Sequence, residues 1–280
     1  MKTVGVVACS NPQELDWKFQ NDDLVKFLES NNINVVMSKY IYKDGAMLTL
    51  NGVQRAEELM SMYLNPDIEY IFDISGGDMA NEILDKLDFE LIKNSKAIFW
   101  GYSDLTTVIN AIYTLTGKSS ILWQVKNTVV GNHQEIQRTR FIIFDELFNP
   151  SFVLVQGNHL NGVVIGGNIR CFLKLAGTRY FPDLTNKILF LESLGGEVPQ
   201  MITYLSQLKS LGVFEKIKGI LLGTFIAMEE KECKPDIIEL VQEFVGSDMP
   251  IATTKEIGHR SNSKAIWIGK EISVSRHDIV

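Results

Sequence analysis

Short apolar runs alternate with amphipathic segments through the first half of the chain. Four apolar runs have the length of buried strands. They lie at residues 3–9, 34–38, 70–74 and 97–100. Three segments between them carry apolar residues at helical spacing, with polar residues in between. They are residues 15–32, 51–64 and 79–94. This strand–helix rhythm predicts a parallel sheet covered by helices.

The pattern weakens after residue 147, where Pro150, Gly157 and Asn158 indicate a crossing between two domains. The second half has five further strand candidates and fewer clear helices, the latter at 200–211 and 235–245. The strand candidates are residues 162–165, 188–192, 219–223, 251–254 and 265–268.

We therefore expect an α/β protein of two domains. Residues 1–150 are predicted to form a parallel-sheet, helix-flanked domain of the Rossmann or flavodoxin-like kind. Residues 160–280 are predicted to form a mixed α/β domain.

Polar, glycine-rich segments follow two of the predicted strands in the first half. "DISGGD" occupies residues 73–78, and "WGYSD" occupies residues 100–104. In open α/β sheets, ligands bind beyond the carboxyl ends of the strands. Both segments are expected at this edge of the sheet, which makes it the candidate site.

Composition narrows the class of protein and of ligand. The 280 residues are 45% hydrophobic and carry a formal net charge of −7, which disfavours nucleic acid as a partner. Three cysteines form no CxxC pair, and four histidines form no HExxH motif or Cys/His cluster. We therefore expect a reducing compartment, the cytoplasm, and neither a metal nor another cofactor. Each apolar run is too short for a membrane helix, so no membrane association is expected.

Ser103 stands where a predicted strand turns sharply into a predicted helix. Such a turn exposes a hydroxyl, and free N–H groups at the helix start can stabilise an oxyanion. "GYSDL" is similar to the G-x-S-x-G nucleophile elbow, but Leu105 replaces the last glycine. The alternative is a serine that caps the helix 104–116. The glycines of "SGGD" favour the catalytic interpretation, because they let backbone approach a ligand closely.

Taken together, the motifs resemble one serine peptidase family over most of the chain. The segment from "SGGD" through "GYSD" to Gly117 is similar to the family of the L,D-carboxypeptidases (muramoyltetrapeptide carboxypeptidases) and microcin C immunity proteins. The similarity continues, in order, through five further segments. They are "VVIGGN" (163–168), "KILFLES" (187–193), residues 207–225, "MPI" (249–251) and "IGH" (257–259).

The resemblance implies a serine hydrolase with a Ser-His-Glu triad. The family nucleophile falls on Ser103, its glutamate on Glu192 and its histidine on His259. Its oxyanion donors, two backbone amides, fall on Gly77 and Asp104. The implied substrate is a small peptide or peptidyl-nucleotide, cut at an amide near a free carboxyl end, and the implied assembly is a homodimer.

Two segments depart from the family pattern and leave specificity open. Thr203 stands where many members have an arginine, and residues 118–132 lack the usual Gly-Pro. An exopeptidase must bind the free carboxylate of its substrate, for which arginine is best suited. Arg260, next to the histidine, is the first candidate, and Arg170, after "GGN", is the second.

Two other classes of protein remain open on the residues alone. A non-catalytic α/β protein that binds a small molecule would show the same two-domain rhythm. An α/β-hydrolase esterase has less support, because the elbow lacks its closing glycine and an HGGG-type segment is absent.

Overall fold

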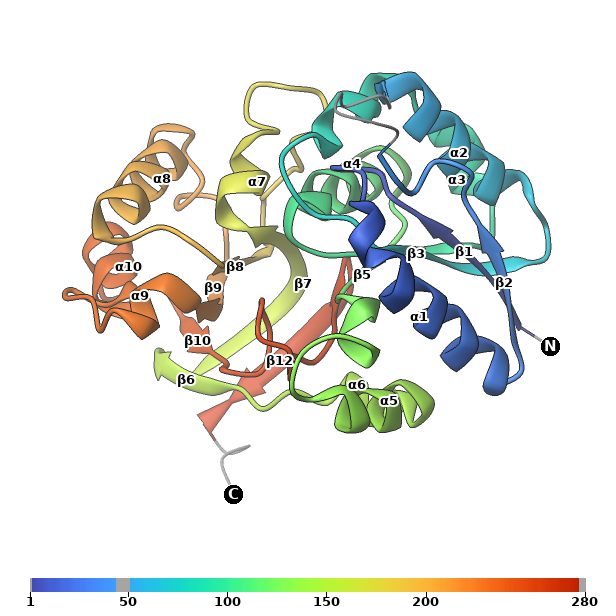
Figure 1. The fold of residues 1–280 in the computed structure, drawn as a ribbon. Helices are drawn as coiled ribbons and strands as arrows, with labels where there is room; N and C mark the ends of the chain where they lie inside the picture. The colour runs from blue at the N-terminus through green and yellow to red at the C-terminus, as the bar shows by residue number, and fades with distance from the viewer. Residues whose placement is uncertain (1, 44–50, 277–280) are drawn as a thin grey trace.

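The computed structural model describes residues 2–43 and 51–276, which form two six-stranded sheets with flanking helices (Figure 1). The strand order of the first sheet is β11-β5-β4-β3-β1-β2. Its strands are β1 (Lys2–Val7), β2 (Ile33–Met37), β3 (Ile68–Asp73), β4 (Ile98–Gly101), β5 (Ser120–Leu122) and β11 (Ile266–Ile268). Strands β1 to β5 are parallel, in the flavodoxin-like order 2-1-3-4-5, and β11 runs antiparallel to β5.

Helices cover both faces of the first sheet. The α-helices are α1 (Lys18–Ser30), α2 (Gly52–Leu64), α3 (Phe89–Asn94), α4 (Thr106–Thr116), α5 (Gln134–Ile142) and α6 (Phe144–Leu147). Short 3-10 helices adjoin them at η1 (Leu15–Trp17), η2 (Ala80–Lys86), η3 (Ser103–Leu105) and η4 (Val125–Thr128).

Side chains alternate between the two faces of the sheet along each strand, and this decides against which helices a strand residue packs. Ile71 and Phe99 pack in one core with α2, α3 and α4, whereas their neighbours Phe72 and Trp100 pack in another with α1 and α5. Because side chains point alternately to the two faces, a strand buried on both reads as a continuous apolar run. The predicted helix-flanked parallel sheet is confirmed.

The second sheet is mixed, as expected, with the order β12-β7-β8-β9-β10-β6. Its strands are β6 (Val153–Gln156), β7 (His159–Asn168), β8 (Ile188–Ser193), β9 (Gly219–Phe225), β10 (Ile251–Thr253) and β12 (Glu271–Ser275). Strands β7 to β10 are parallel, and the edge strands β6 and β12 are antiparallel to their neighbours. The helices of this half are α7 (Ile169–Leu173), α8 (Val198–Ser210), α9 (Ile226–Glu230) and α10 (Ile237–Val245).

An apolar core joins the two sheets. Val164 and Phe190 of the second sheet belong to the same buried cluster as Ile109 and Ile112 of α4. The chain also returns, since β11, from the part assigned to the C-terminal domain, completes the first sheet. The two halves are therefore held in one relative position, while the boundaries at 150 and 160 stay a prediction.

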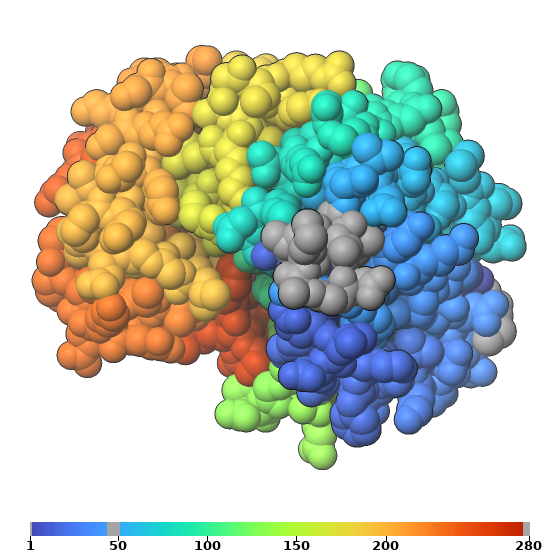
Figure 2. All heavy atoms as spheres, turned by 45° about the horizontal axis from the view of Figure 1, so that its top comes forward, coloured from blue at the N-terminus to red at the C-terminus, as the bar shows by residue number. Residues whose placement is uncertain are grey.

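Both sheets direct their carboxyl ends to one region between the halves. When the top of Figure 1 is tilted toward the viewer, the surface is hollowed between the blue first half and the orange second half (Figure 2). The red C-terminal part of the chain is visible at the bottom of this hollow. The loops after β3, β4 and β10 and the end of β8 carry the predicted catalytic and oxyanion residues.

Candidate functional site

Ser103 occupies a strained corner between β4 and α4. Its φ angle is +54°, a left-handed conformation that is uncommon for a residue with a side chain. The alternative role as a helix cap is wrong, because the N-cap residue of α4 is Leu105 and no side chain caps that helix. The strand therefore ends in a turn that presents the hydroxyl rather than using it to start a helix.

Glu192 and His259 form a buried hydrogen-bonded pair. Nδ1 of His259 lies 2.5 Å from Oε2 of Glu192, and the two side chains are 5% and 1% exposed. When Nδ1 carries the proton and donates it to the carboxylate, Nε2 keeps a free lone pair. Nε2 of His259 is buried without a hydrogen-bond partner. The pair has the arrangement of a general base with an orienting carboxylate.

The loop after β10 reaches this position through Gly258. Its φ is +144°, and a Cβ here would lie 2.0 Å from Oγ1 of Thr224. A side chain would therefore push the loop, and His259 with it, away from β9.

The serine shares a pocket with this pair. Ser103, Glu192 and His259 line one small pocket together with Tyr102, whose ring centroid lies 5.3 Å from that of His259. Burial raises the pKa of the Tyr102 phenol. The structure thus brings together three residues that the sequence separates widely.

Gly77 and Asp104, the expected oxyanion donors, belong to neighbouring loops. A Cβ on Gly77, whose φ is +128°, would lie 2.2 Å from Cγ of Asn11. Oδ1 of Asn11 accepts from the N–H of Asp78 at 3.0 Å, so the close approach fixes the loop. Asp104 lies in η3, directly after Ser103.

Ser10 and Lys174 contact these loops, and the sequence analysis did not predict either of them. The fully buried carboxylate of Asp104 accepts from Oγ of Ser10, the N–H of Ala80 and Nζ of Lys174, at 2.6, 2.8 and 2.6 Å. The clue was a serine directly after the first strand, but serines are common in such positions.

Arg55 supports the same loops from α2. Its buried guanidinium donates to the carbonyl oxygens of Cys9, Ser10 and Met79 and pairs with Glu82. A buried arginine that satisfies these backbone carbonyls holds together the loops that follow β1 and β3.

The two candidate arginines lie in different hollows. Arg170 lines a hollow of about 370 Å³ together with Ser103, and it pairs with the exposed Asp78. Arg260 lines a hollow of about 290 Å³ together with His259, and its Nη2 lies 2.8 Å from Oε2 of Glu229. Both guanidinium groups are partly exposed.

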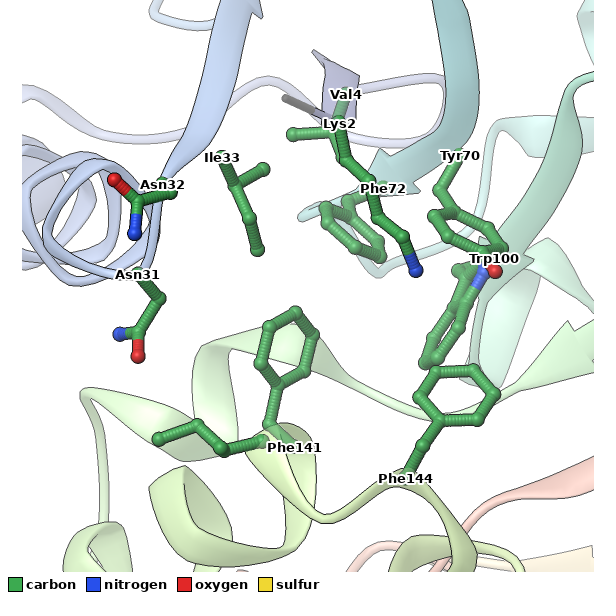
Figure 3. Close-up of a pocket in the computed structure, with 11 residues that line it drawn as sticks. Lys2, Val4, Asn31, Asn32, Ile33, Tyr70, Phe72, Trp100, Phe141 and Phe144 are labelled. Atoms are coloured by element: carbon green, nitrogen blue, oxygen red, sulfur yellow. The ribbon is translucent and has the colours of Figure 1, made fainter.

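A further hollow of about 400 Å³ lies away from this site. It opens over the other face of the first sheet, between the end of α1 and α5, and its wall is largely aromatic (Figure 3). Tyr70, Phe72, Trp100 and Phe141 contribute their rings. None of the candidate site residues lines it.

Among residues 2–43 and 51–276, no cluster of three or more His, Cys, Asp or Glu could hold a metal ion. The three cysteines are free. Over the same ranges, we find no helix with the length and apolar character needed to span a membrane.

Family models match both halves of the chain. The model for the LD-carboxypeptidase N-terminal domain matches residues 4–122, and that for the LD-carboxypeptidase C-terminal domain matches residues 161–274.

Curated relatives match along nearly the whole chain. A probable murein peptide carboxypeptidase of Bacillus subtilis is 28% identical, with 98% of this chain and 88% of the relative covered. The microcin C7 self-immunity protein MccF of Escherichia coli is 23% identical, with 97% and 90% covered.

Solved structures share the fold. A structure of MccF in complex with glutamyl sulfamoyl guanosine matches with a TM-score of 0.87 at 23% identity, covering 98% of this chain and 93% of that one. The muramoyltetrapeptide carboxypeptidase from Oxalobacter formigenes matches with a TM-score of 0.78 at 21% identity, covering 98% and 95%.

Proposed function

Because this chain belongs to the LD-carboxypeptidase family, we propose that it is a serine carboxypeptidase that removes the C-terminal residue of a murein peptide. The observation that carries the proposal is the buried His259–Glu192 pair: Nε2 of His259 has no hydrogen-bond partner, and His259 lines the same small pocket as Ser103. A protein that only binds a small molecule has no use for a base beside a strained serine.

The reaction follows from these three side chains. Nε2 of His259 takes the proton of the Ser103 hydroxyl as Oγ attacks the scissile carbonyl carbon. Glu192 keeps the ring oriented and stabilises the imidazolium. The same proton then passes to the leaving amine, the C–N bond breaks, and an acyl ester of Ser103 remains. A water molecule gives a proton to His259 and attacks the ester carbonyl. The same proton then passes to Oγ of Ser103 as the C–O bond breaks, which releases the shortened peptide and restores the free serine.

The oxygen of the tetrahedral intermediate would be stabilised by the N–H groups of Gly77 and Asp104. Backbone donors held in place before the reaction stabilise charge that develops only in the transition state. Support comes from the close approach of Gly77 to Asn11, which leaves little freedom in that loop. Asp104 is held as firmly, through its buried carboxylate.

Recognition of the free carboxylate has two candidates. Adjacency to the base favours Arg260, whereas the shared hollow with Ser103 favours Arg170. We give Arg170 the larger role, because a substrate bound in that hollow reaches Ser103 directly. Asp78, its present partner, is exposed and easily replaced by a substrate carboxylate.

A second candidate reaction is amide cleavage in a peptidyl-nucleotide of the microcin type. Tyr204 lines the hollow of Ser103 and Arg170, and its ring offers a surface on which a nucleobase could stack. The departures at Thr203 and residues 118–132 bear on this choice of substrate.

Incubation with both substrates separates the two reactions. Purified protein is mixed with a murein tetrapeptide or with a microcin-type aminoacyl-nucleotide, and the products are weighed by mass spectrometry. Loss of the terminal D-residue supports the carboxypeptidase; release of the amino acid from the nucleotide supports the alternative. A fluorophosphonate probe that fails to label Ser103 in the intact protein would favour a binding protein.

Assembly and location complete the proposal. A homodimer is supported by the family resemblance, and light scattering of the purified protein tests it. A role in recycling of peptidoglycan fragments in the cytoplasm agrees with three free cysteines, since disulfides are rare in that compartment.

A further inference from the structure

One ammonium group contacts both loops that carry the proposed oxyanion donors. Nζ of Lys174 donates to Oδ1 of Asp104 at 2.6 Å and to the carbonyl oxygen of Asp78 at 2.9 Å. Asp104 is one of the donor residues, and Asp78 directly follows Gly77, the other. Lys174 therefore joins the two loops from the second half of the molecule, in addition to the N–H of Ala80, which donates to the same carboxylate at 2.8 Å. Arg170 donates to the carbonyl oxygen of Gly77 but makes no contact with Asp104 among the hydrogen bonds of the described residues.

The contact crosses from one half of the molecule to the other. Lys174 follows α7, in the second half, whereas Ser10 and Ala80, which also donate to the Asp104 carboxylate, belong to the first. The carboxylate is 0% exposed and the lysine side chain 20%. Because Lys174 is the ionic partner of this buried carboxylate, the position and the stability of Asp104 depend on where the ammonium group lies.

We propose that Lys174 is a positioning residue for the hydrolytic reaction, which holds the N–H groups of Gly77 and Asp104 at the separation that the oxyanion requires. This inference rests on the proposed function of the site. Neither of these two hydrogen bonds involves Ser103 or His259. Lys174 therefore acts on the reaction indirectly, by fixing the positions of Asp104 and of the residue after Gly77. Charge on the oxyanion develops only in the transition state, so loss of Lys174 lowers kcat and leaves KM nearly unchanged.

A structural role alone predicts a different result. If Lys174 merely neutralised a buried charge, its removal would lower stability, and removal of both charges would restore stability and activity together. The two roles are separated by Lys174→Met and by the double variant Lys174→Met/Asp104→Asn. The control is Lys86→Met, which removes an exposed lysine paired with Asp85.

The measurements are kcat and KM on the murein tetrapeptide and the thermal midpoint of unfolding. We expect kcat to fall by about 10- to 100-fold in both the single and the double variant, with KM within about twofold. The midpoint should fall in Lys174→Met and recover in the double variant. The control should match the wild type. Recovery of kcat together with the midpoint, or a change in KM alone, overturns the inference.

A second readout separates this inference from the proposed function. Phosphonylation of Ser103 by a fluorophosphonate also places an oxygen between the two donors, so its rate should fall by a similar factor in both variants. A wild type that reacts with the probe but cleaves neither substrate refutes the proposed function and leaves the positioning role testable. Equal labelling rates in the wild type and both variants would exclude that role, and a wild type that is not labelled would exclude both.

Discussion

His259 and Glu192 are 67 positions apart, yet Nδ1 of one lies 2.5 Å from Oε2 of the other. Glu192 is the penultimate residue of β8, His259 follows β10, and β9 lies between these two strands in the sheet. The imidazole bridges this gap because the loop after β10 folds back against Thr224 at Gly258. The contact between His259 and Glu192 therefore depends on the order of β8, β9 and β10 in the sheet and on the path of the loop after β10.

Replacing the carboxylate with an amide of the same shape tests its role. In Glu192→Gln, we expect kcat to fall by about 10³- to 10⁴-fold, because the amide no longer stabilises the imidazolium or selects the productive tautomer. Steady-state kinetics on the cleaved substrate give the value, and circular dichroism checks the fold. Activity within a few-fold of the wild type would remove Glu192 from the mechanism.

Substitutions of Ser103 separate catalysis from backbone strain. Both Ser103→Ala and Ser103→Gly should lose on the order of 10⁴-fold or more in turnover. The glycine variant should be the more stable of the two, by about 1 kcal/mol, because only glycine adopts a φ of +54° without strain. Denaturant unfolding of the pair measures this difference. Full activity in either variant would show that the hydroxyl is not the nucleophile.

The arginines are tested by comparing a free acid with its C-terminal amide. Arg170→Ala should raise KM for the acid by about 10-fold or more and remove the preference for it over the amide. Arg260→Ala is the matched variant, since Arg260 lines the hollow of His259 instead. Loss of the preference in Arg260→Ala alone would assign the carboxylate to Arg260.

Lys126 makes stability depend on pH. Burial lowers the pKa of its ammonium group from 10.5 to about 8. Below pH 8 the folded protein must keep the charge against this penalty, whereas above pH 10.5 both states are neutral. The contribution of Lys126 to the free energy of unfolding should therefore rise with pH between 8 and 10.5, by up to roughly 3 kcal/mol.

Lys126→Met should lack this contribution, so its free energy of unfolding should rise less between pH 8 and 10.5 than that of the wild type. Lys26→Met, which removes an exposed lysine, should follow the wild type. Denaturant unfolding at several pH values, with each variant compared to the wild type, gives the difference. A parallel dependence in the wild type and Lys126→Met would assign the effect to other groups.

The sequence by itself determined the first four strands and the polar segments at the ends of two of them, whereas the strands β5, β6 and β12 were not predicted. Apolar runs of strand length and helical spacing are local patterns, and each predicted strand of the first half lies within a few residues of its observed position. "SGGD" and "GYSD" meet at one edge because β3 and β4 are adjacent and parallel.

Only the tertiary structure decided which distant residues meet. Nothing near Lys174 in the chain predicts a contact with Asp104, and nothing near Arg55 predicts that its charge is buried against backbone carbonyls. The return of β11 to the first sheet has no local sign either. Such contacts depend on how two sheets pack around a shared apolar core, and that packing is a property of the whole chain rather than of any segment.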